Sequence, residues 1–372
     1  MADEVPASRW STRYTTAYRF MLVDRSTGLE TAELRTLRAE GSTISRNQDT
    51  QIKESASIAC AGGFDAGTGL VRCYFCPRWA DGYEADVPVG TWLPNVPSRE
   101  VDGLSESSTV SCSGRLQELS DDAFESPLTI AAGESPVEVA ADIVRSCGLG
   151  CEADESDYRL SAPWTFGLAT DSEDGGSKLD AVNALLSIAG FASATTDGMG
   201  TVQLRRYVEP SAKSPSWSFA EGPLARFERS MTEERDTSKV ANVVVAVYST
   251  QEAEYVGVAV DDDPLSPWST VARGRRIVAS YSYSDLPEGV DGDEAQRYAD
   301  AKAAQLLETE QAPVRRVRFS HVYAPVSPGD VVRMDFPSGS VSGSFAVRTQ
   351  DMELSGGGLR TTCEARSFEG RR

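Results

Sequence analysis

The sequence predicts a mainly β protein with a small α+β insertion, and three observations support this prediction. Short runs of β-branched, aromatic or alternating residues recur through residues 12–125 and again through 209–372. Clusters of turn-forming residues separate these runs, as they do between the strands of a sheet. Two helix signals lie in residues 126–208, and one more lies at about 291–310. We therefore expect an N-terminal β domain, an α+β insertion domain and a C-terminal β-rich region with these boundaries.

The N-terminal region contains five candidate strands at short spacing. They are the runs AYRFMLV, STISR, ESASIACAG, LVRCYF and STVSCSGRL. The segments ADGYEADVPVG and PNVPSREVDG hold several Gly, Pro, Asp and Asn residues, so we expect both to be loops. Many short strands separated by turns are typical of a β-sandwich or a β-barrel.

The insertion begins with a helix whose start and end are both marked in the sequence. Ser135 is the expected N-cap, Pro136 suits the first helical position, and Glu138 completes a capping box. Apolar residues then recur at helical spacing, and Gly148 is expected to end the helix.

A second helix and a hairpin complete the insertion. Ser177 and Asp180 are expected to cap the helix, and Gly190 to end it. The runs FASATT and TVQLRRY flank the turn DGMG, and this pattern predicts a β-hairpin. The insertion is therefore expected to be a small α+β domain.

The C-terminal region starts after a Pro- and Ser-rich stretch at 209–223, which indicates a boundary. Its candidate strands are NVVVAVYS, EYVGVAV, RRIVASYSYS, VRRVRFSHVYAP, GDVVRMDF, GSFAVRTQDMEL and LRTTCEARSFE. The helix at about 291–310 interrupts them, with Asp291 and Glu294 as its expected capping residues.

One turn in this region is marked with particular clarity. Pro328 presets its own φ, Gly329 suits a positive φ, and Asp330 can bond nearby backbone. The alternating run VVRMDF follows at once and ends at Pro337. We expect a strand that starts sharply and keeps its register.

Composition excludes several classes of function. The chain has 372 residues, with 36 Lys and Arg against 56 Asp and Glu, so its formal net charge is −20. Binding to a nucleic-acid backbone would call for clustered positive charge, which this balance argues against. No run approaches the length of a membrane helix, and the N-terminus shows no secretory signal. Seven cysteines are too few, and odd in number, for a disulfide scaffold, so we expect a reducing compartment.

Candidate catalytic and metal-binding residues are weak throughout. His321 is the only histidine, it lies mid-strand, and the chain lacks a nucleophile-elbow motif, so we expect a structural or exposed residue. Cys73 and Cys76 form a Cys-x-x-Cys motif without a second ligand pair at matching spacing. We expect structural cysteines there, and also at Cys147 and Cys151.

Acidic runs at 171–176 and 261–263 lack the spaced ligands of a calcium loop, and we expect solvated turns. The chain contains no phosphate-binding loop and no dinucleotide fingerprint. We therefore assign no catalytic, cofactor-binding or metal-binding residue, expect no cofactor, and predict that the protein is not an enzyme.

Three motifs in this order resemble a known family. They are LDAVNALLSIAGF (179–191), DGMGTV (197–202) and VSPGDVVRMDF (326–336), which follow a β region and an insertion helix. The chain is similar, over about residues 15–370, to the hub proteins of bacteriophage tail tips and contractile-tail baseplates, which also occur in prophage-derived tails.

The resemblance implies a structural role. It implies two β-barrel-type hub domains flanking the helix-containing domain, and a homotrimeric ring that adapts the hexameric tail tube to the tip and surrounds the DNA channel. Implied partners are tail-tube or distal tail ring proteins, the tape-measure protein, and tip or fibre proteins. It implies a virion tail location after assembly in the bacterial host cytoplasm. Because the sequence stops at FEGRR, any cell-wall-degrading activity is expected on another polypeptide.

Two rival functions remain open at the level of sequence. A receptor- or carbohydrate-binding β-sandwich tail protein would use exposed aromatic residues, for which the six tryptophans are candidates: Trp10, Trp79, Trp92, Trp164, Trp217 and Trp268. Tryptophans more often serve as core or interface residues. An enzyme with paired carboxylates or a Cys-His pair is the other rival, and it has no motif in its favour.

Overall fold

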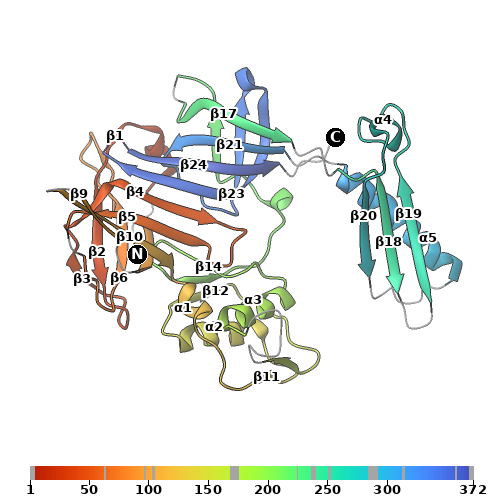
Figure 1. Cartoon of the computed structure of the whole chain (residues 1–372), viewed down its shortest axis with the longest axis horizontal. Coiled ribbons are helices and arrows are strands. Elements are labelled where there is room, and N and C mark those ends of the chain that lie inside the picture. Colours follow the sequence, from red (N-terminus) through yellow and green to blue (C-terminus); the bar gives the residue numbers. More distant parts are fainter. Residues whose placement is uncertain are drawn as a thin grey trace. The chain divides into compact units, whose positions relative to one another are not determined.

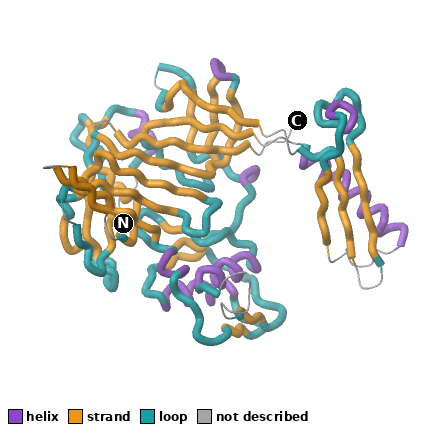
Figure 2. The backbone as a smooth tube through the Cα atoms, viewed as in Figure 1, coloured by secondary structure: helices purple, strands orange, loops and turns teal. Residues whose placement is uncertain are grey.

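The computed structural model describes most of the chain. The described residues are 5–62, 64–95, 98–102, 105–167, 176–223, 225–235, 240–249, 253–283, 292–311, 315–356 and 358–367. They form two compact units: Met1–Met231 with Arg318–Ala365, and Thr232–Val317 with Arg366–Arg372 (Figure 1). Strands dominate both units, and most helices of the first unit gather in one module (Figure 2). The prediction of a mainly β fold is therefore confirmed.

A large mixed sheet organises the first unit. Its strands run in the order β17-β21-β24-β23-β4-β5-β10-β8-β6-β2-β3, with β22 also joined to β23, β16 to β22, and β9 to β10. The N-terminal strands are β2 (Tyr18–Val23), β3 (Glu30–Glu33), β4 (Leu37–Asn47), β5 (Glu54–Cys60), β6 (Leu70–Phe75), β8 (Val87–Pro94), β9 (Ser98–Asp102) and β10 (Ser105–Gly114). The C-terminal strands are β16 (Trp217–Ala220), β17 (Phe227–Arg235), β21 (Arg315–Val322), β22 (Val331–Phe336), β23 (Val341–Ser355) and β24 (Gly358–Ser367). A separate short pair, β1 (Tyr14–Thr15) with β7 (Arg78–Trp79), follows the 3-10 helix η1 (Ala7–Ser11).

The long strand β23 joins the two ends of the chain. Its first part pairs with β22, from Phe336 opposite Val341 to Val331 opposite Ala346. Its second part pairs antiparallel with β4, the partners including Thr349 with Asn47. One strand therefore ties residues about three hundred positions apart into a single hydrogen-bonded sheet.

Two segments that the sequence predicts to be loops hold strands instead. β8 lies between β10 and β6, and β9 pairs with β10. The prolines misled the prediction because Pro88 falls where the β6–β8 register shifts, and Pro94 is the last residue of β8. Proline is tolerated at such irregularities and strand ends, although not in a regular central ladder.

The predicted turn at Pro328–Gly329–Asp330 is confirmed by its geometry. Gly329 has φ +94° and donates its backbone N–H to the Val347 carbonyl at 2.8 Å. The Asp330 carboxylate accepts the Ser327 N–H at 2.8 Å. β22 then alternates buried and exposed residues as expected, and the 3-10 turn η3 (Pro337–Gly339) ends it.

The insertion has the expected helices and hairpin. Its elements are α1 (Gln117–Ser120), β11 (Leu128–Ile130), α2 (Pro136–Ser146), β12 (Cys151–Ala153), β13 (Trp164–Phe166), α3 (Lys178–Ile188), β14 (Thr195–Thr196) and β15 (Val202–Leu204), before the 3-10 turn η2 (Pro210–Ala212). The Ser135 hydroxyl accepts the Glu138 N–H, and the Ser177 hydroxyl accepts the Asp180 N–H. Gly148 and Gly190 both have positive φ beyond their helices. These local signals predicted the helices correctly because capping depends on near neighbours.

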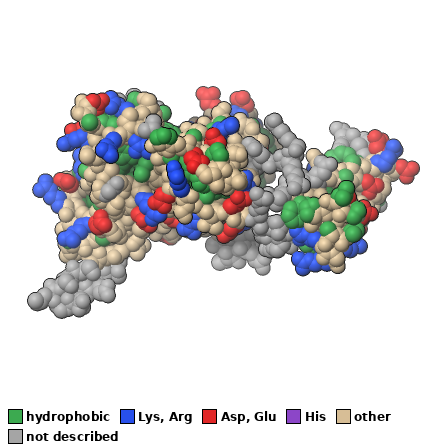
Figure 3. Space-filling model, turned by 90° about the horizontal axis from the view of Figure 1, so that it is seen from above, with side chains coloured by type: hydrophobic (Ala, Val, Ile, Leu, Met, Phe, Trp, Pro, Cys, Tyr) green, Lys and Arg blue, Asp and Glu red, His purple; other side chains and the backbone are tan. Residues whose placement is uncertain are grey.

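The second unit is a three-stranded sheet with helix α5 (Gly292–Glu310) against one face. Its strands, in the order β19 (Glu254–Val260), β18 (Val243–Ser249) and β20 (Val278–Tyr283), are accompanied by the short helix α4 (Thr270–Arg273). Gly257 lets α5 approach closely, because a Cβ there would lie 2.0 Å from the Ala299 carbonyl oxygen. Figure 3 shows hydrophobic side chains gathered on this unit, and its exposed valines include Val256, Val258 and Val260.

The structure thus separates residues 232–317 as a compact unit inside the predicted region 209–372. Three of the strands predicted there belong to this unit, and so does the helix predicted at about 291–310. The boundaries 12–125, 126–208 and 209–372, and the two-barrel arrangement, stay predictions. Asp291 and residues 171–175, named above as a capping residue and an acidic turn, lie outside the described residues. In the part of the chain that is described, no helix is both long and apolar enough to span a membrane.

Candidate functional site

The DGMG turn of the insertion hairpin is pressed against the N-terminal sheet. A Cβ on Gly198 would lie 2.0 Å from the carbonyl oxygen of Pro88 in β8, so only glycine fits this approach. The Thr91 hydroxyl, also on β8, donates to the Gly198 carbonyl at 3.0 Å. The glycine in the DGMG motif therefore allows the backbone of the hairpin to contact the backbone of β8.

A buried arginine fastens the next residue of the turn. Arg72 on β6 is 4% exposed and donates from Nη2 to the Met199 carbonyl at 3.1 Å. Its Nε donates to the Thr91 hydroxyl at 2.9 Å, and its Nη1 to Glu30 Oε1 at 3.1 Å. Arg72 therefore connects the hairpin residue Met199 to β8 through Thr91 and to β3 through Glu30.

A second buried pair, Arg115 with Glu118, lies next to the hairpin. Arg115 lies 2.9 Å from Glu118 Oε2, and Glu118 Oε1 lies 3.0 Å from Arg25 Nε. A Cβ on Gly200 would lie 2.7 Å from the Arg115 side chain, and Gly200 has φ +80°. The hairpin turn is thus held by strands β6 and β8 and by the Arg115 side chain, which lies just before α1.

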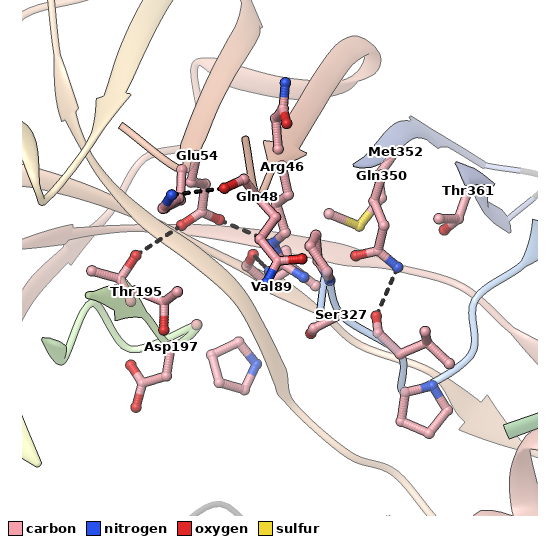
Figure 4. A pocket seen from close by; sticks show the side chains of 18 of the residues that line it. Arg46, Gln48, Glu54, Val89, Thr195, Asp197, Ser327, Gln350, Met352 and Thr361 are labelled. Carbon is pink, nitrogen blue, oxygen red and sulfur yellow. Dashed lines mark hydrogen bonds and ion pairs between the residues drawn. The ribbon is translucent and has the colours of Figure 1, made fainter. Parts of the chain in front are cut away.

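Beside the hairpin lies a half-open pocket of about 360 Å³. Three parts of the chain line it: β4, β5 and β8, then residues 195–198 of the hairpin, and then the 323–328 segment with β23 and β24 (Figure 4). The pocket is therefore the place where the N-terminal sheet, the insertion and the C-terminal strands meet within the first unit.

A buried carboxylate joins two of these parts. Glu54 accepts from Arg46 Nε at 3.3 Å and from the Thr196 hydroxyl at 3.4 Å. Arg46 also donates to the Val89 carbonyl. Burial raises the pKa of Glu54, and the neighbouring Arg46 guanidinium opposes this rise. The arrangement links the hairpin to β4 and β5, and offers no carboxylate free to act as an acid or base.

His321 lies in the core and contacts a cysteine. Of the two positions expected from the sequence, structural or exposed, the structure shows the structural one. Its Nδ1 lies 2.6 Å from the Val322 carbonyl oxygen, which can only accept, so Nδ1 carries the proton. Its Nε2 lies 3.3 Å from Cys363 Sγ. Sequence reasoning missed this pair because the two residues are brought together only by adjacent strands β21 and β24.

This Cys-His pair has the residue types of a nucleophilic site, but its side chains are not ionised as such a site requires. Burial lowers the pKa of His321 to about 4 and raises the pKa of Cys363 to about 12. Both side chains are therefore neutral at pH 7, whereas a cysteine nucleophile needs an accessible thiolate. Cys363 is 0% exposed, and Phe219 and Phe319 pack around the imidazole ring.

The other sequence candidates do not assemble into a site. Cys73 is buried on β6 and Cys76 follows the strand end, and burial is the main cause of a raised pKa for both thiols. In the turn at 261–263, the Asp261 carboxylate accepts from the Ser266 hydroxyl and from Gln311, which follows α5. Among the described residues, no three His, Cys, Asp or Glu side chains are grouped as metal ligands.

The tryptophans do not form an exposed binding platform. Trp10, Trp79 and Trp92 are buried in the N-terminal core, where Trp10 stacks on Phe75. The other three, Trp164, Trp217 and Trp268, are half-buried. The tryptophans therefore do not provide the exposed aromatic surface that a carbohydrate-binding protein would use.

Together these features define a class of protein: a mainly β protein in which a helical insertion contacts a sheet built from both ends of the chain. No protein-family model matches the chain, and no curated protein matches its sequence. Solved structures, in contrast, share its fold over nearly the whole length.

Three solved structures illustrate the likeness. The tail protein from Neisseria meningitidis MC58 covers 95% of this chain and 97% of its own, with 16% identity and a TM-score of 0.60. The 43 kDa tail protein of prophage MuSo2 from Shewanella oneidensis covers 94% and 98%, with 10% identity and a TM-score of 0.58. A chain of the half-lidded Francisella PdpA–VgrG complex covers 96% and 58%, with 8% identity and a TM-score of 0.53. The chain thus has the fold of phage and prophage tail proteins, and the resemblance to tail hubs is confirmed at the level of fold.

Proposed function

We propose that this chain is a structural hub subunit of a phage tail tip or baseplate, or of a tail derived from a phage. The observation that carries the proposal is the length of the likeness: 95% of this chain and 97% of the Neisseria tail protein superpose. A likeness of this extent includes the β regions and the insertion, so the whole architecture is shared and not one common domain.

In this proposal three copies form a ring that adapts the hexameric tail tube to the tip and surrounds the DNA channel. The net charge of −20 suits a conduit, because acidic walls repel the phosphates of the passing DNA. Neighbouring proteins in the tail would be the tail-tube or distal tail ring, the tape measure, and the tip or fibre proteins. The chain would act in the virion tail after assembly in the host cytoplasm, without sequence-specific binding to DNA.

The proposed role is mechanical and not catalytic. The residues with catalytic chemistry, His321 and Cys363, are buried and neutral, and the paired carboxylate Glu54 holds the hairpin. In this proposal, the contacts around the hairpin and the shared strand β23 would transmit force between parts of the subunit.

A deletion experiment tests the proposal. Removing the gene from the producing strain should yield particles without complete tails, and supplying the gene in trans should restore them. Gold-labelled antibodies against the chain should mark the tail tip in electron micrographs. Normal tails in the deletion strain, or label confined to fibres away from the tip, would contradict the hub function and favour a receptor-binding protein.

A further inference from the structure

The three-stranded sheet of the second unit has one covered face and one exposed face. Helix α5 covers the first, where the core contains Val244, Ala246 and Tyr248 of β18 (Figure 1). Side chains alternate between the two faces of a strand, so the residues between these three lie on the exposed face. The strand register sets that face in three rows: Val260, Val243 and Val278, then Val258, Val245 and Ser280, then Val256, Val247 and Ser282. We call these residues the valine face.

The valine face is apolar and accessible. Its four outer valines, on the edge strands β19 and β20, are between 41% and 53% exposed. On the central strand, Val245 and Val247 are half-buried and Val243 is buried. The face holds only valine and serine, so its middle carries no charge. Contiguous exposed apolar residues of this kind mark a protein interaction surface.

Opposite charges flank one end of the valine face. Asp262 follows β19 and Arg276 precedes β20, each two residues from a valine of the face. Asn242, just before β18, accepts from the Asp261 N–H at 2.9 Å and donates to the Ile277 carbonyl at 3.0 Å. The strand pattern therefore continues to this end, and alternation sets Asp262 and Arg276 on the side of the valine face. Both are exposed, and within the described residues neither has an ion-pair partner.

We propose that a second copy of this chain covers the valine face in a weak twofold pair. The twofold axis runs parallel to the strands and between the two faces, so β19 of each copy lies over β20 of the other. The large side chains of Val256 and Val258 then face the small Ser282 and Ser280 of the other copy. The valine ridge of one copy thus fills the serine trough of the other, as in the face-to-face packing of two sheets.

The flanking charges select this axis. With the axis along the strands, Asp262 of each copy meets Arg276 of the other, and the pair gains two contacts between opposite charges. With the axis across the strands, Asp262 would instead lie near Glu254, because β19 would face the opposite end of β19 in the other copy. Juxtaposed like charges disfavour that second arrangement.

The size of the valine face determines the strength of the pair. Three strands about 4.8 Å apart, over about five residues of about 3.4 Å each, present roughly 250 Å². A stable dimer buries about 800 Å² on each partner, so we expect a dissociation constant above about 1 µM. A twofold contact is also distinct from the heterologous contacts that close a ring of three. The pairing and the ring therefore succeed or fail independently.

Sedimentation equilibrium of the purified full chain, at concentrations from about 1 µM to about 1 mM, tests the pairing. The average mass should rise reversibly with concentration by a factor that approaches two. A constant mass over this range would overturn the proposal and would assign the valine face to a different protein or to another part of the same chain.

Charge reversal tests the arrangement within the pair. Asp262→Arg and Arg276→Asp each create like charges at both contacts, so each variant alone should associate at least about tenfold more weakly. An equimolar mixture of the two variants should associate as wild type does, because each copy then meets the opposite charge at both contacts. Asp300→Arg, on the exposed side of α5, is the matched control and should leave association unchanged. A mixture no stronger than the single variants, or an equal loss in the control, would overturn the proposed axis.

Shortening a valine tests the apolar part of the contact. Val258→Ala removes two methyl groups from each copy and should weaken association about tenfold. Val208→Ala is the matched control, because Val208 is 42% exposed in the first unit and Val258 is 49% exposed. Thermal unfolding should show that both variants remain folded. Equal association of the two variants would show that the valine face is not the surface that pairs.

Discussion

His321 illustrates how burial decides the chemistry of a single side chain. The sequence indicated a structural or exposed histidine, and the structure places it in the core, 2% exposed. Its two hydrogen-bond partners, Val322 and Cys363, hold the neutral ring in one tautomer. The residue type that would serve catalysis at the surface therefore serves packing here.

Replacing His321 by Gln should cost about 1–2 kcal/mol of stability at pH 7, through the hydrogen bonds that it loses. Tails should still assemble and infect at near-normal titre. Complete loss of infectivity with intact tails would contradict the non-enzymatic function and point to His321 as a catalytic group.

The same substitution should also change the pH dependence of stability. The pKa of His321 is about 4 when folded, against roughly 6.5 when unfolded. Between these values the unfolded chain binds a proton that the folded chain does not, so stability falls as pH falls, by up to about 3 kcal/mol. Chemical unfolding should show the gap between wild type and His321→Gln shrinking from pH 7 to pH 5. A gap that stays constant would show that His321 is not buried as described.

The cysteines should behave as free thiols of low reactivity. All seven are free in the structure, and burial is the main cause of the raised pKa of Cys73, Cys112 and Cys363. Thiol titration of the unfolded, unreduced protein should find close to seven groups, and the native protein should react slowly at these three. Three disulfides, or stoichiometric zinc, would contradict this prediction.

At the scale of elements, the sequence predicted those features that depend on near neighbours. The caps of α2 and α3, the DGMG hairpin and the turn before β22 all match the structure. Pairings between distant segments could not be predicted, such as β23 with β4 or the parallel pair β16 with β22. The paired strands lie more than a hundred residues apart in the sequence. The alternation of apolar and polar residues predicts a strand but does not identify its partner. The junction pocket depends on these pairings and was missed for the same reason.

Gly198→Ala tests whether the hairpin clamp is real. Its Cβ would clash with the Pro88 backbone at 2.0 Å, so the hairpin would have to move away from β8. We expect about 2–4 kcal/mol of destabilisation and faster proteolysis between the insertion and the sheet. Gly150→Ala is the matched control, because its Cβ would meet only Thr201 at 3.4 Å. Equal stability of the two variants would contradict the close approach.

Gly329→Val and Asp330→Pro test the turn that starts β22. Valine at φ +94° should cost about 1–2 kcal/mol or more, and proline removes the Asp330 N–H that bonds Ser327 at 3.1 Å. Both variants should reduce folded yield and tail assembly. Gly356→Ala, with open space around its Cβ, should behave as wild type. Normal folding and assembly of both turn variants would show that the turn does not set the register of β22.

At the scale of the whole molecule, the proposed function depends on assembly of several copies. The chain builds one sheet from its two ends, clamps an insertion onto it, and shares its fold with tail proteins. A ring of three copies around the tube axis is the central claim of the proposed function. Heterologous contacts between identical subunits close into such rings.

Electron cryo-microscopy of purified tails tests this claim most directly. We predict three copies of the 40.0 kDa chain in one ring, coaxial with the tube, with their β regions toward the channel. The first unit should fit the threefold density at the tip as a single body. A different number of copies, or a position away from the tube axis, would contradict the hub function.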